Sequence, residues 1–339
     1  MGYFKNVIIC FHLNMSIHKR IDPDSKIPLD KLLSTFPGGI NAIHDIKERR
    51  SLTNSLFKLM SSELPTNENV LIDDIIIAGP NKLSELSLRI YKPKLISDRL
   101  PGILFIHGGG MIMGSIEGEN LKAAMLCEEI NALVVSVEYR LAPEHPYPAQ
   151  LNDCYEALIW MSKNSKELRF DPDRLAIVGG SAGGGLTLAT ALNARDLEFP
   201  KVKFLMANYP MIDDRNDTPS SKEILDIGIW DRSTNIQAWD WYLGGKKADA
   251  YAAPARAIDL SGLPPTFIDV GELDLFRDED ILFATRLMQA SVTTELHVYP
   301  GAYHASESFA PEAELSKKIW TKRLEALKNA LNLDKSKVI

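Results

Sequence analysis

Short apolar segments that alternate with helical stretches place the strongest constraint on the fold of this 339-residue chain. The segments are rich in Val, Ile, Leu and Phe, and helical stretches lie between most of them. Strands that are apolar on both faces are typical of a mostly parallel sheet with helices packed on both sides. We therefore expect an α/β fold, with ligands at the carboxyl ends of the strands. The predicted strands are residues 102–106, 132–137, 175–178, 204–208, 266–270 and 295–299, preceded by strand-like runs at 70–72 and 86–91.

A serine follows one of these strands in a glycine-rich turn. Residues 179–183 read GGSAG, directly before a helical stretch. Glycines on both sides of Ser181 permit the strained dihedrals and close contacts that a sharp strand-to-helix turn requires. The hydroxyl would then stand clear of the sheet as a nucleophile. The spacing alone is about as typical of a glycine turn with a capping serine.

A second glycine run follows the strand at 102–106. Gly108, Gly109 and Gly110 come directly after His107, which we expect to hold this loop by hydrogen bonds. Acyl transfer produces an oxyanion, and backbone N–H groups directed at it are a large catalytic contribution. Ala182 would supply one donor and two of the three glycines would supply the others; the sequence leaves open which two. Neither run has the spacing of a dinucleotide or P-loop motif.

A serine nucleophile also needs a base, and the order Ser, acid, His limits the choice. Of the seven histidines, only His297 and His304 follow Ser181. His297 lies inside a predicted strand, whereas His304 lies in the loop beyond that strand, where catalytic residues concentrate. We therefore predict His304 as the base.

The acid that would orient this base should follow the strand at 266–270. Glu272, Asp274 and Asp278 all lie beyond its end. Reasoning from the residues does not choose among them, and two of the three are expected to be ordinary loop charges.

Composition excludes several other functions. Balancing 38 Lys and Arg against 45 Asp and Glu gives a net charge of −7, which disfavours nucleic acid as a partner. Three cysteines at wide spacing, Cys10, Cys127 and Cys154, suit a reducing compartment and suggest no zinc site, so we expect a cytoplasmic protein. No run has the length needed to span a membrane. The acidic run at 213–217 lacks the glycine and ligand spacing of a calcium loop.

Several motifs in order make the chain resemble the hormone-sensitive-lipase branch of the α/β-hydrolases, over nearly its whole length. These are HGGG at 107–110, EYRLAPEHP at 138–146, GGSAGG at 179–184, DLFRDE at 274–279 and GAYH at 301–304. Relatives often carry Asp, Glu or Thr before the serine, where this chain has Gly180, and Pro-Leu where it has Leu275 and Phe276.

The resemblance implies the α/β-hydrolase fold and a serine esterase. It places the nucleophile on Ser181, the acid on Asp274, the base on His304 and the oxyanion loop on the glycines after His107. The implied substrates are short- to medium-chain acyl esters, and the mechanism requires no metal or organic cofactor.

The resemblance also implies a helical cap over the core. The expected segments are 1–65 for the N-terminal part of the cap, 66–208 and 256–339 for the two parts of the core, and 209–255 for a cap insertion. This insertion carries Trp230, Trp239, Trp241 and Tyr242, most of which we expect to pack in the core. A closing amphipathic helix is assigned only a packing role.

Other functions remain compatible with the same motifs. An amidase, a lactonase or a deacetylase would use the same three residues on another bond. A noncatalytic small-molecule receptor is disfavoured because all three candidate residues are present. The sequence leaves open the natural substrate, the stereoselectivity and whether the chain forms a homodimer.

Overall fold

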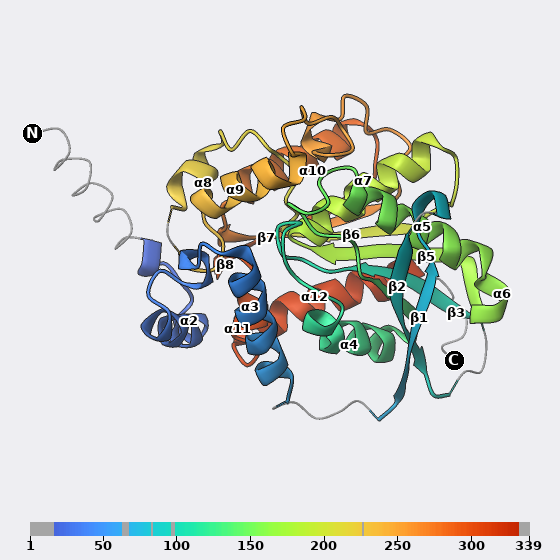
Figure 1. The fold of residues 1–339 in the computed structure, drawn as a ribbon, viewed down its shortest axis with the longest axis horizontal. Coiled ribbons are helices and arrows are strands. Elements are labelled where there is room, and N and C mark those ends of the chain that lie inside the picture. The colour runs from blue at the N-terminus through green and yellow to red at the C-terminus, as the bar shows by residue number, and fades with distance from the viewer. Residues whose placement is uncertain (1–16, 63–67, 83, 96–98, 226, 332–339) are drawn as a thin grey trace, which may run out of the picture.

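One mixed sheet forms the centre of the molecule (Figure 1). The computed structural model describes residues 17–62, 68–82, 84–95, 99–225 and 227–331. Within them, the eight strands lie in the order β1-β2-β4-β3-β5-β6-β7-β8. β2 is antiparallel to β1 and β4, and the other neighbours are parallel. The strands are β1 (Val70–Ala78), β2 (Glu85–Pro93), β3 (Leu100–Ile106), β4 (Leu133–Val137), β5 (Phe170–Gly180), β6 (Phe204–Asn208), β7 (Thr266–Leu273) and β8 (Thr294–Tyr303).

The central strands are buried on both faces, as their continuous apolar sequences predict. Every residue of β3, β4 and β6 is buried, whereas β1 is mostly exposed. Each fully buried Val, Leu or Ile side chain contributes about 1.5–3 kcal/mol relative to an exposed one. The predicted α/β fold with a mostly parallel sheet is therefore confirmed. Several predicted strands were too short. The observed strands continue into polar residues that the apolar pattern does not mark, such as Glu272 near the end of β7.

Helices cover both faces of the sheet (Figure 1). α5, α7 and α10 pack on one face, and α4 and α12 pack on the other. The buried hydrophobic residues follow this division, with Leu186 and Phe283 in one cluster and Leu126 and Leu327 in another. The helices are α2 (Pro23–Thr35), α3 (Ile46–Ser62), α4 (Asn120–Ile130), α5 (Ala149–Lys163), α6 (Ser165–Leu168), α7 (Ala182–Asp196), α8 (Pro219–Glu223), α9 (Arg232–Leu243), α10 (Arg277–Gln289), α11 (Ser306–Phe309) and α12 (Glu314–Leu331), with 3-10 turns at Ile40–Ala42, Pro80–Lys82, Glu117–Glu119 and Pro254–Arg256.

The N-terminal helices pack against the segment that carries α8 and α9, although about 190 residues separate them. The Asn41 side chain donates to the carbonyl of Ile229 at 3.1 Å and to Asp231 at 3.1 Å. Gly39 lies so close to Gly228 that a Cβ on Gly39 would come within 1.9 Å of the Gly228 carbonyl oxygen. Figure 1 places α2, α3, α8 and α9 at one side of the molecule, near the labelled ends of β7 and β8.

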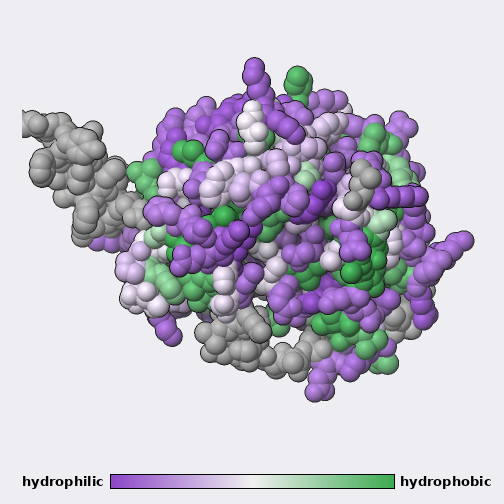
Figure 2. All heavy atoms as spheres, viewed as in Figure 1, coloured by the Kyte–Doolittle hydropathy of each residue, from purple (hydrophilic) through white to green (hydrophobic). Residues whose placement is uncertain are grey.

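The visible surface in Figure 2 is predominantly polar, with hydrophobic side chains in small separate patches. In the described part of the chain, no helix is both long enough and apolar enough to span a membrane. Cys127 and Cys154 are buried with free thiols, and Cys10 lies outside the described residues. The first 16 residues of the predicted segment 1–65 also lie outside them.

Candidate active site

Ser181 occupies a sharp turn between β5 and α7. Its backbone has φ +58° and ψ −121°, a conformation that non-glycine residues rarely adopt and that concentrates at functional sites. The turn tolerates no Cβ at Gly183, where one would come within 2.1 Å of the Ile106 carbonyl oxygen. The Ser181 carbonyl accepts hydrogen bonds from Gly185 and Met211, both at 3.0 Å, which holds the strained residue in place.

His304 connects Ser181 to Asp274 through its two ring nitrogens. Nε2 lies 3.0 Å from Ser181 Oγ, and Nδ1 lies 2.8 Å from Asp274 Oδ2. Because an ionised carboxylate only accepts hydrogen bonds, Nδ1 carries the proton and Nε2 accepts from the serine hydroxyl. Asp274 is fully buried, and its other oxygen accepts from the Phe276 backbone at 3.0 Å. The imidazole is thus fixed in the tautomer that can take a proton from serine.

The other histidine that follows the serine does not reach this group. His297 lies within β8, where its ring nitrogen bonds Glu295 at 2.7 Å. β8 continues to Tyr303, so the residues predicted as a loop before His304 belong to the strand, and His304 follows its end directly. The histidine beyond the strand, and not the one within it, lies beside Ser181.

The glycine loop after β3 adopts a backbone that requires glycine at two positions. Gly109 and Gly110 have φ of +111° and +63°. A Cβ on Gly110 would come within 2.2 Å of the Trp230 ring. His107 stacks on Tyr139 with ring centroids 4.0 Å apart, and its Nδ1 lies 2.8 Å from the carbonyl oxygen of Gly108.

Comparison with known proteins identifies the family. Residues 103–308 match the family model described as the alpha/beta hydrolase fold. The chain belongs to the α/β-hydrolase fold family. It is 35% identical over 316 residues to carboxylesterase NlhH of Mycobacterium tuberculosis, covering 91% of this chain and 97% of that protein.

Solved structures agree with this assignment. A bacterial heroin esterase is 35% identical, with a TM-score of 0.86 over 92% of this chain and 98% of that one. Esterase LipW from Mycobacterium marinum is 31% identical, with a TM-score of 0.77 over 92% and 96%. The predicted hormone-sensitive-lipase branch of serine esterases is confirmed, and the chain is an enzyme of this class.

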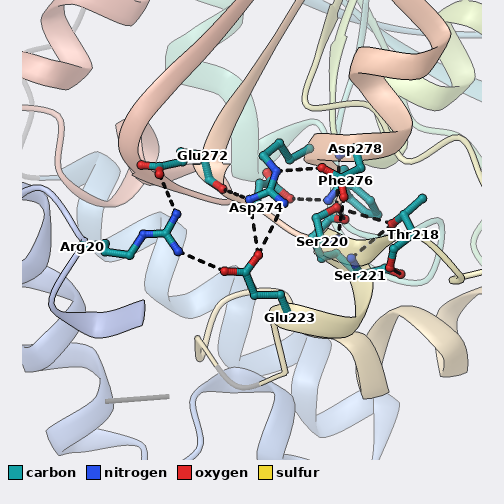
Figure 3. Close-up of polar contacts among 11 residues, drawn as sticks. Arg20, Thr218, Ser220, Ser221, Glu223, Glu272, Asp274, Phe276 and Asp278 are labelled. Atoms are coloured by element: carbon teal, nitrogen blue, oxygen red, sulfur yellow. Dashed lines mark hydrogen bonds and ion pairs between the residues drawn. The ribbon is translucent and has the colours of Figure 1, made fainter. Parts of the chain in front are cut away.

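Of the three carboxylates that the sequence offered as the acid, Glu272 and Asp278 bond groups other than His304 in this α/β-hydrolase (Figure 3). Glu272 bonds Arg20 at 2.6 Å and the Gly301 backbone at 3.1 Å. Asp278 bonds Arg277 at 2.8 Å and the Ser220 backbone at 2.7 Å. They are therefore paired groups and not simple solvated charges. Hydrogen bonding to Arg20 lowers the pKa of Glu272; for Asp278, burial opposes ionisation but the Arg277 contact still lowers the pKa.

Two further carboxyls near Asp274 are buried and do not contact His304. Burial raises the pKa of Glu279 and of Asp280 well above the usual carboxyl range. Glu279 accepts the backbone N–H groups of Ile212 and Asp213 at 3.1 and 3.2 Å, so it fixes the chain after β6. Among the described residues, no group of three or more His, Cys, Asp or Glu side chains could hold a metal ion.

Aromatic side chains surround the His304 ring. Tyr209, Phe276 and Trp230 have ring centroids 4.9, 5.3 and 6.4 Å from that of His304. Sequence reasoning named Trp230 only as one of several aromatic residues in the insertion, and it missed Tyr209. Tyr209 comes directly after β6, at the carboxyl end of a parallel strand, and that position is a signal that could have found it.

Proposed function

We propose that this enzyme hydrolyses carboxylic esters of short- to medium-chain acids through Ser181, His304 and Asp274. The observation that carries the proposal is the unbroken series of hydrogen bonds from Ser181 Oγ through His304 to Asp274. The names of the relatives, a carboxylesterase and a heroin esterase, support an ester as the substrate. Ser181 is buried, and the aromatic rings of Tyr209, Trp230 and Phe276 around its partner His304 suit a small uncharged substrate.

In the first step, His304 Nε2 removes the Ser181 proton as Oγ attacks the ester carbonyl carbon. The imidazolium that forms is stabilised by the Asp274 carboxylate, which keeps its negative charge. His304 then returns the proton to the departing alcohol, and the acyl group stays on Ser181 as an ester.

The oxyanion of this step requires backbone donors with no other partner. Among the hydrogen bonds of the described residues, the Gly108 N–H faces Glu119 Oε1 at 3.5 Å, whereas the N–H groups of Gly109 and Gly110 have no protein acceptor. Ala182 begins α7, so its N–H has no acceptor within the helix. We therefore assign the oxyanion to Gly109, Gly110 and Ala182, with Gly108 in a supporting position.

Water completes the cycle by the same chemistry. His304 removes a proton from a water molecule as the water oxygen attacks the acyl carbon of the Ser181 ester. The second tetrahedral oxyanion collapses, the Ser181 oxygen takes the proton back from His304, and the free acid leaves.

We assign the cap to the N-terminal helices and to the insertion at 209–255. The contacts of Asn41 with Ile229 and Asp231 support a single unit made from both segments. Trp230, on this unit, lies against both Gly110 and His304 and would limit the size of the group bound there.

Replacing the nucleophile tests the proposal. Ser181→Ala should lower the turnover of a short-chain nitrophenyl ester by about 10⁴-fold or more, because Ser181 carries the one hydroxyl among the described residues that bonds His304 Nε2. Ser316→Ala is the matched control, since Ser316 is a fully buried serine on α12. The readouts are initial rates and covalent labelling by a fluorophosphonate, located by peptide mass spectrometry. Labelling at another residue, or near-normal turnover by Ser181→Ala, would reject the assignment.

A further inference from the structure

A buried cluster of four side chains reaches the His304 ring through one of its members, Tyr209. It consists of Tyr209 after β6, Asp269 on β7, Glu307 on α11 and Arg323 on α12, and we refer to it as the Arg323 cluster. All four are buried, with at most 6% of any residue exposed. Nothing in the three-residue mechanism uses them.

Arg323 connects the two carboxylates of the cluster. It forms a two-point contact with Asp269 at 2.7 and 3.1 Å, and its third nitrogen donates to Glu307 Oε1 at 2.7 Å. The same Glu307 oxygen accepts the hydroxyl of Tyr209 at 2.7 Å. The guanidinium also lies over the Tyr209 ring, 5.3 Å from its centroid. Tyr209 is therefore held by Glu307 at its hydroxyl and by Arg323 at its face.

Tyr209 transmits this arrangement to the base. Its ring meets the His304 ring edge-on, at an interplanar angle of 67°. Its backbone has φ +35°, and its N–H donates to the Asp269 carbonyl at 2.6 Å. A strained backbone fixed at both ends leaves the ring little freedom, so the ring forms a rigid wall beside the imidazole.

This wall explains the unusual Gly180 before the nucleophile. A Cβ at position 180 would lie 3.2 Å from the ring edge and hydroxyl of Tyr209, which is closer than ordinary contact. A longer side chain would displace the ring. The space beside Gly180 is instead lined by Tyr209, Glu307 and Arg323, together with Glu119 and Lys122.

The cluster carries a net negative charge next to the base. Although burial opposes ionisation of Glu307, the charges of Arg323 and then Lys122 hold its pKa at about 2, so it is ionised throughout the working range. Burial raises the pKa of Asp269, but its two-point bond to Arg323 is that of a carboxylate. Two carboxylates and one guanidinium leave one excess negative charge within the cluster, and the neighbouring Lys122 and Glu119 form an ion pair whose charges offset each other. Buried ion pairs are often no more stabilising than apolar packing, so stability alone does not account for the cluster.

We propose that Glu307 and Arg323 are positioning residues that act on His304 through Tyr209, fixing the imidazole and stabilising its protonated form during the reaction. α12, to which the sequence assigned only packing, then contributes to catalysis through Arg323. The inference rests on the proposed role of His304 as the base. Among the described residues, the charged group that contacts the His304 side chain is Asp274, after β7. Ser181, Tyr209, Phe276 and Trp230 contact it without charge, and the charges of Glu307 and Arg323 lie behind the Tyr209 ring.

The charge is tested with Glu307→Gln, which keeps an oxygen for Tyr209 and Arg323 but removes the negative charge. With less stabilisation, the imidazolium loses its proton at a lower pH. The acidic limb of the kcat/KM profile should therefore move to lower pH by about 0.5 unit, while the plateau of kcat falls about 3- to 10-fold. Loss of structure alone would lower the plateau without moving the limb. The matched control is Asp153→Asn, because Asp153 is a buried carboxylate on α5 that pairs with Arg140.

Tyr209→Phe tests whether Glu307 positions His304 through the tyrosine. The substitution keeps the ring and removes its hydrogen bond to Glu307. We expect kcat to fall about 3- to 10-fold with little change in KM. Tyr299→Phe is the control, because Tyr299 is a buried tyrosine on β8 whose hydroxyl has no partner. If Glu307→Gln does not fold, as judged by circular dichroism, Tyr209→Phe decides the proposal alone.

The rate of Ser181 modification by a fluorophosphonate, measured against pH, separates this inference from the proposed function. A shifted limb in Glu307→Gln, with Ser181 still labelled, supports the inference. Normal profiles in both Glu307→Gln and Tyr209→Phe, with Ser181 labelled, would overturn it and leave the triad in place. Failure of Ser181 to be labelled in the unmodified enzyme would instead reject the function on which it rests.

Discussion

Glu272, Asp274 and Asp278 lie within seven positions of one another, yet their surroundings give them different chemistry. Asp274 is fully buried and bonds His304, whereas Glu272 and Asp278 bond arginines near the surface. A buried carboxylate beside a ring N–H is the one group of the three that can fix the tautomer of the base. The other two connect segments of chain.

Substitution of the three carboxylates should separate these roles. Asp274→Asn keeps the shape but stabilises the wrong tautomer, so kcat should fall by about 10³- to 10⁴-fold. Glu272→Gln and Asp278→Asn should each lower kcat by no more than about 10-fold, because they remove only partly exposed ion pairs. Steady-state kinetics on one nitrophenyl ester measures all three. Similar losses in the three variants would contradict the assignment of Asp274.

At the scale of elements, the segment between β6 and β7 brings the indole ring of Trp230 to the site. Trp230 precedes α9 and is 3% exposed, and its indole N–H donates to Asn235 at 3.0 Å. Asn235 in turn donates to Asn216 at 2.6 Å. The ring is thus fixed by a hydrogen bond while its six-membered part lies against Gly110. A fixed indole cannot swing away to admit a longer acyl or alcohol group.

Shortening this side chain should change the preference for chain length. We compare kcat/KM for nitrophenyl hexanoate with kcat/KM for nitrophenyl acetate. Trp230→Leu should raise the hexanoate-to-acetate ratio by about 10-fold, since each additional methylene that fits contributes to transition-state binding. Trp239→Leu is the control, because Trp239 is equally buried on α9 but packs on Tyr242. An unchanged ratio in Trp230→Leu would show that this ring does not limit the pocket.

At the scale of the whole molecule, a charged network holds the N-terminal segment to the ends of β7 and β8, which precede Asp274 and His304 (Figure 3). Arg20 bonds Glu223 on α8 at 3.0 Å and Glu272 at 2.6 Å. Glu272 also accepts the Gly301 N–H, and the Asp22 N–H donates to the Gly301 carbonyl at 3.0 Å. Four segments distant in the sequence therefore meet at one partly exposed network.

Because this network is partly exposed, its contribution should be small and sensitive to salt. Arg20→Met keeps the apolar stem, and it should lower the free energy of unfolding by about 0.5–1 kcal/mol at low ionic strength. The difference from the unmodified enzyme should vanish near about 1 M salt, where screening acts over about 3 Å. Urea unfolding at both salt concentrations measures it, with Lys322→Met on α12 as an exposed ion-pair control. A loss that is independent of salt would mean that packing, and not charge, holds the segment.

The sequence by itself determined the α/β fold and the position of most strands, and it predicted Ser181 and His304 as partners. The spacing of apolar residues, the glycine-rich turns and the order of residues along the chain can all be read without the tertiary structure. The sequence left Asp274 equal to Glu272 and Asp278 until a family resemblance was considered, and it did not distinguish among Gly108, Gly109 and Gly110. Only the tertiary structure decided which carboxylate meets His304 and which N–H groups lack a partner. It also revealed the Arg323 cluster, in which Tyr209 and Glu307 are 98 positions apart. Such contacts depend on how strands and helices pack, and residue spacing along the chain carries no record of them.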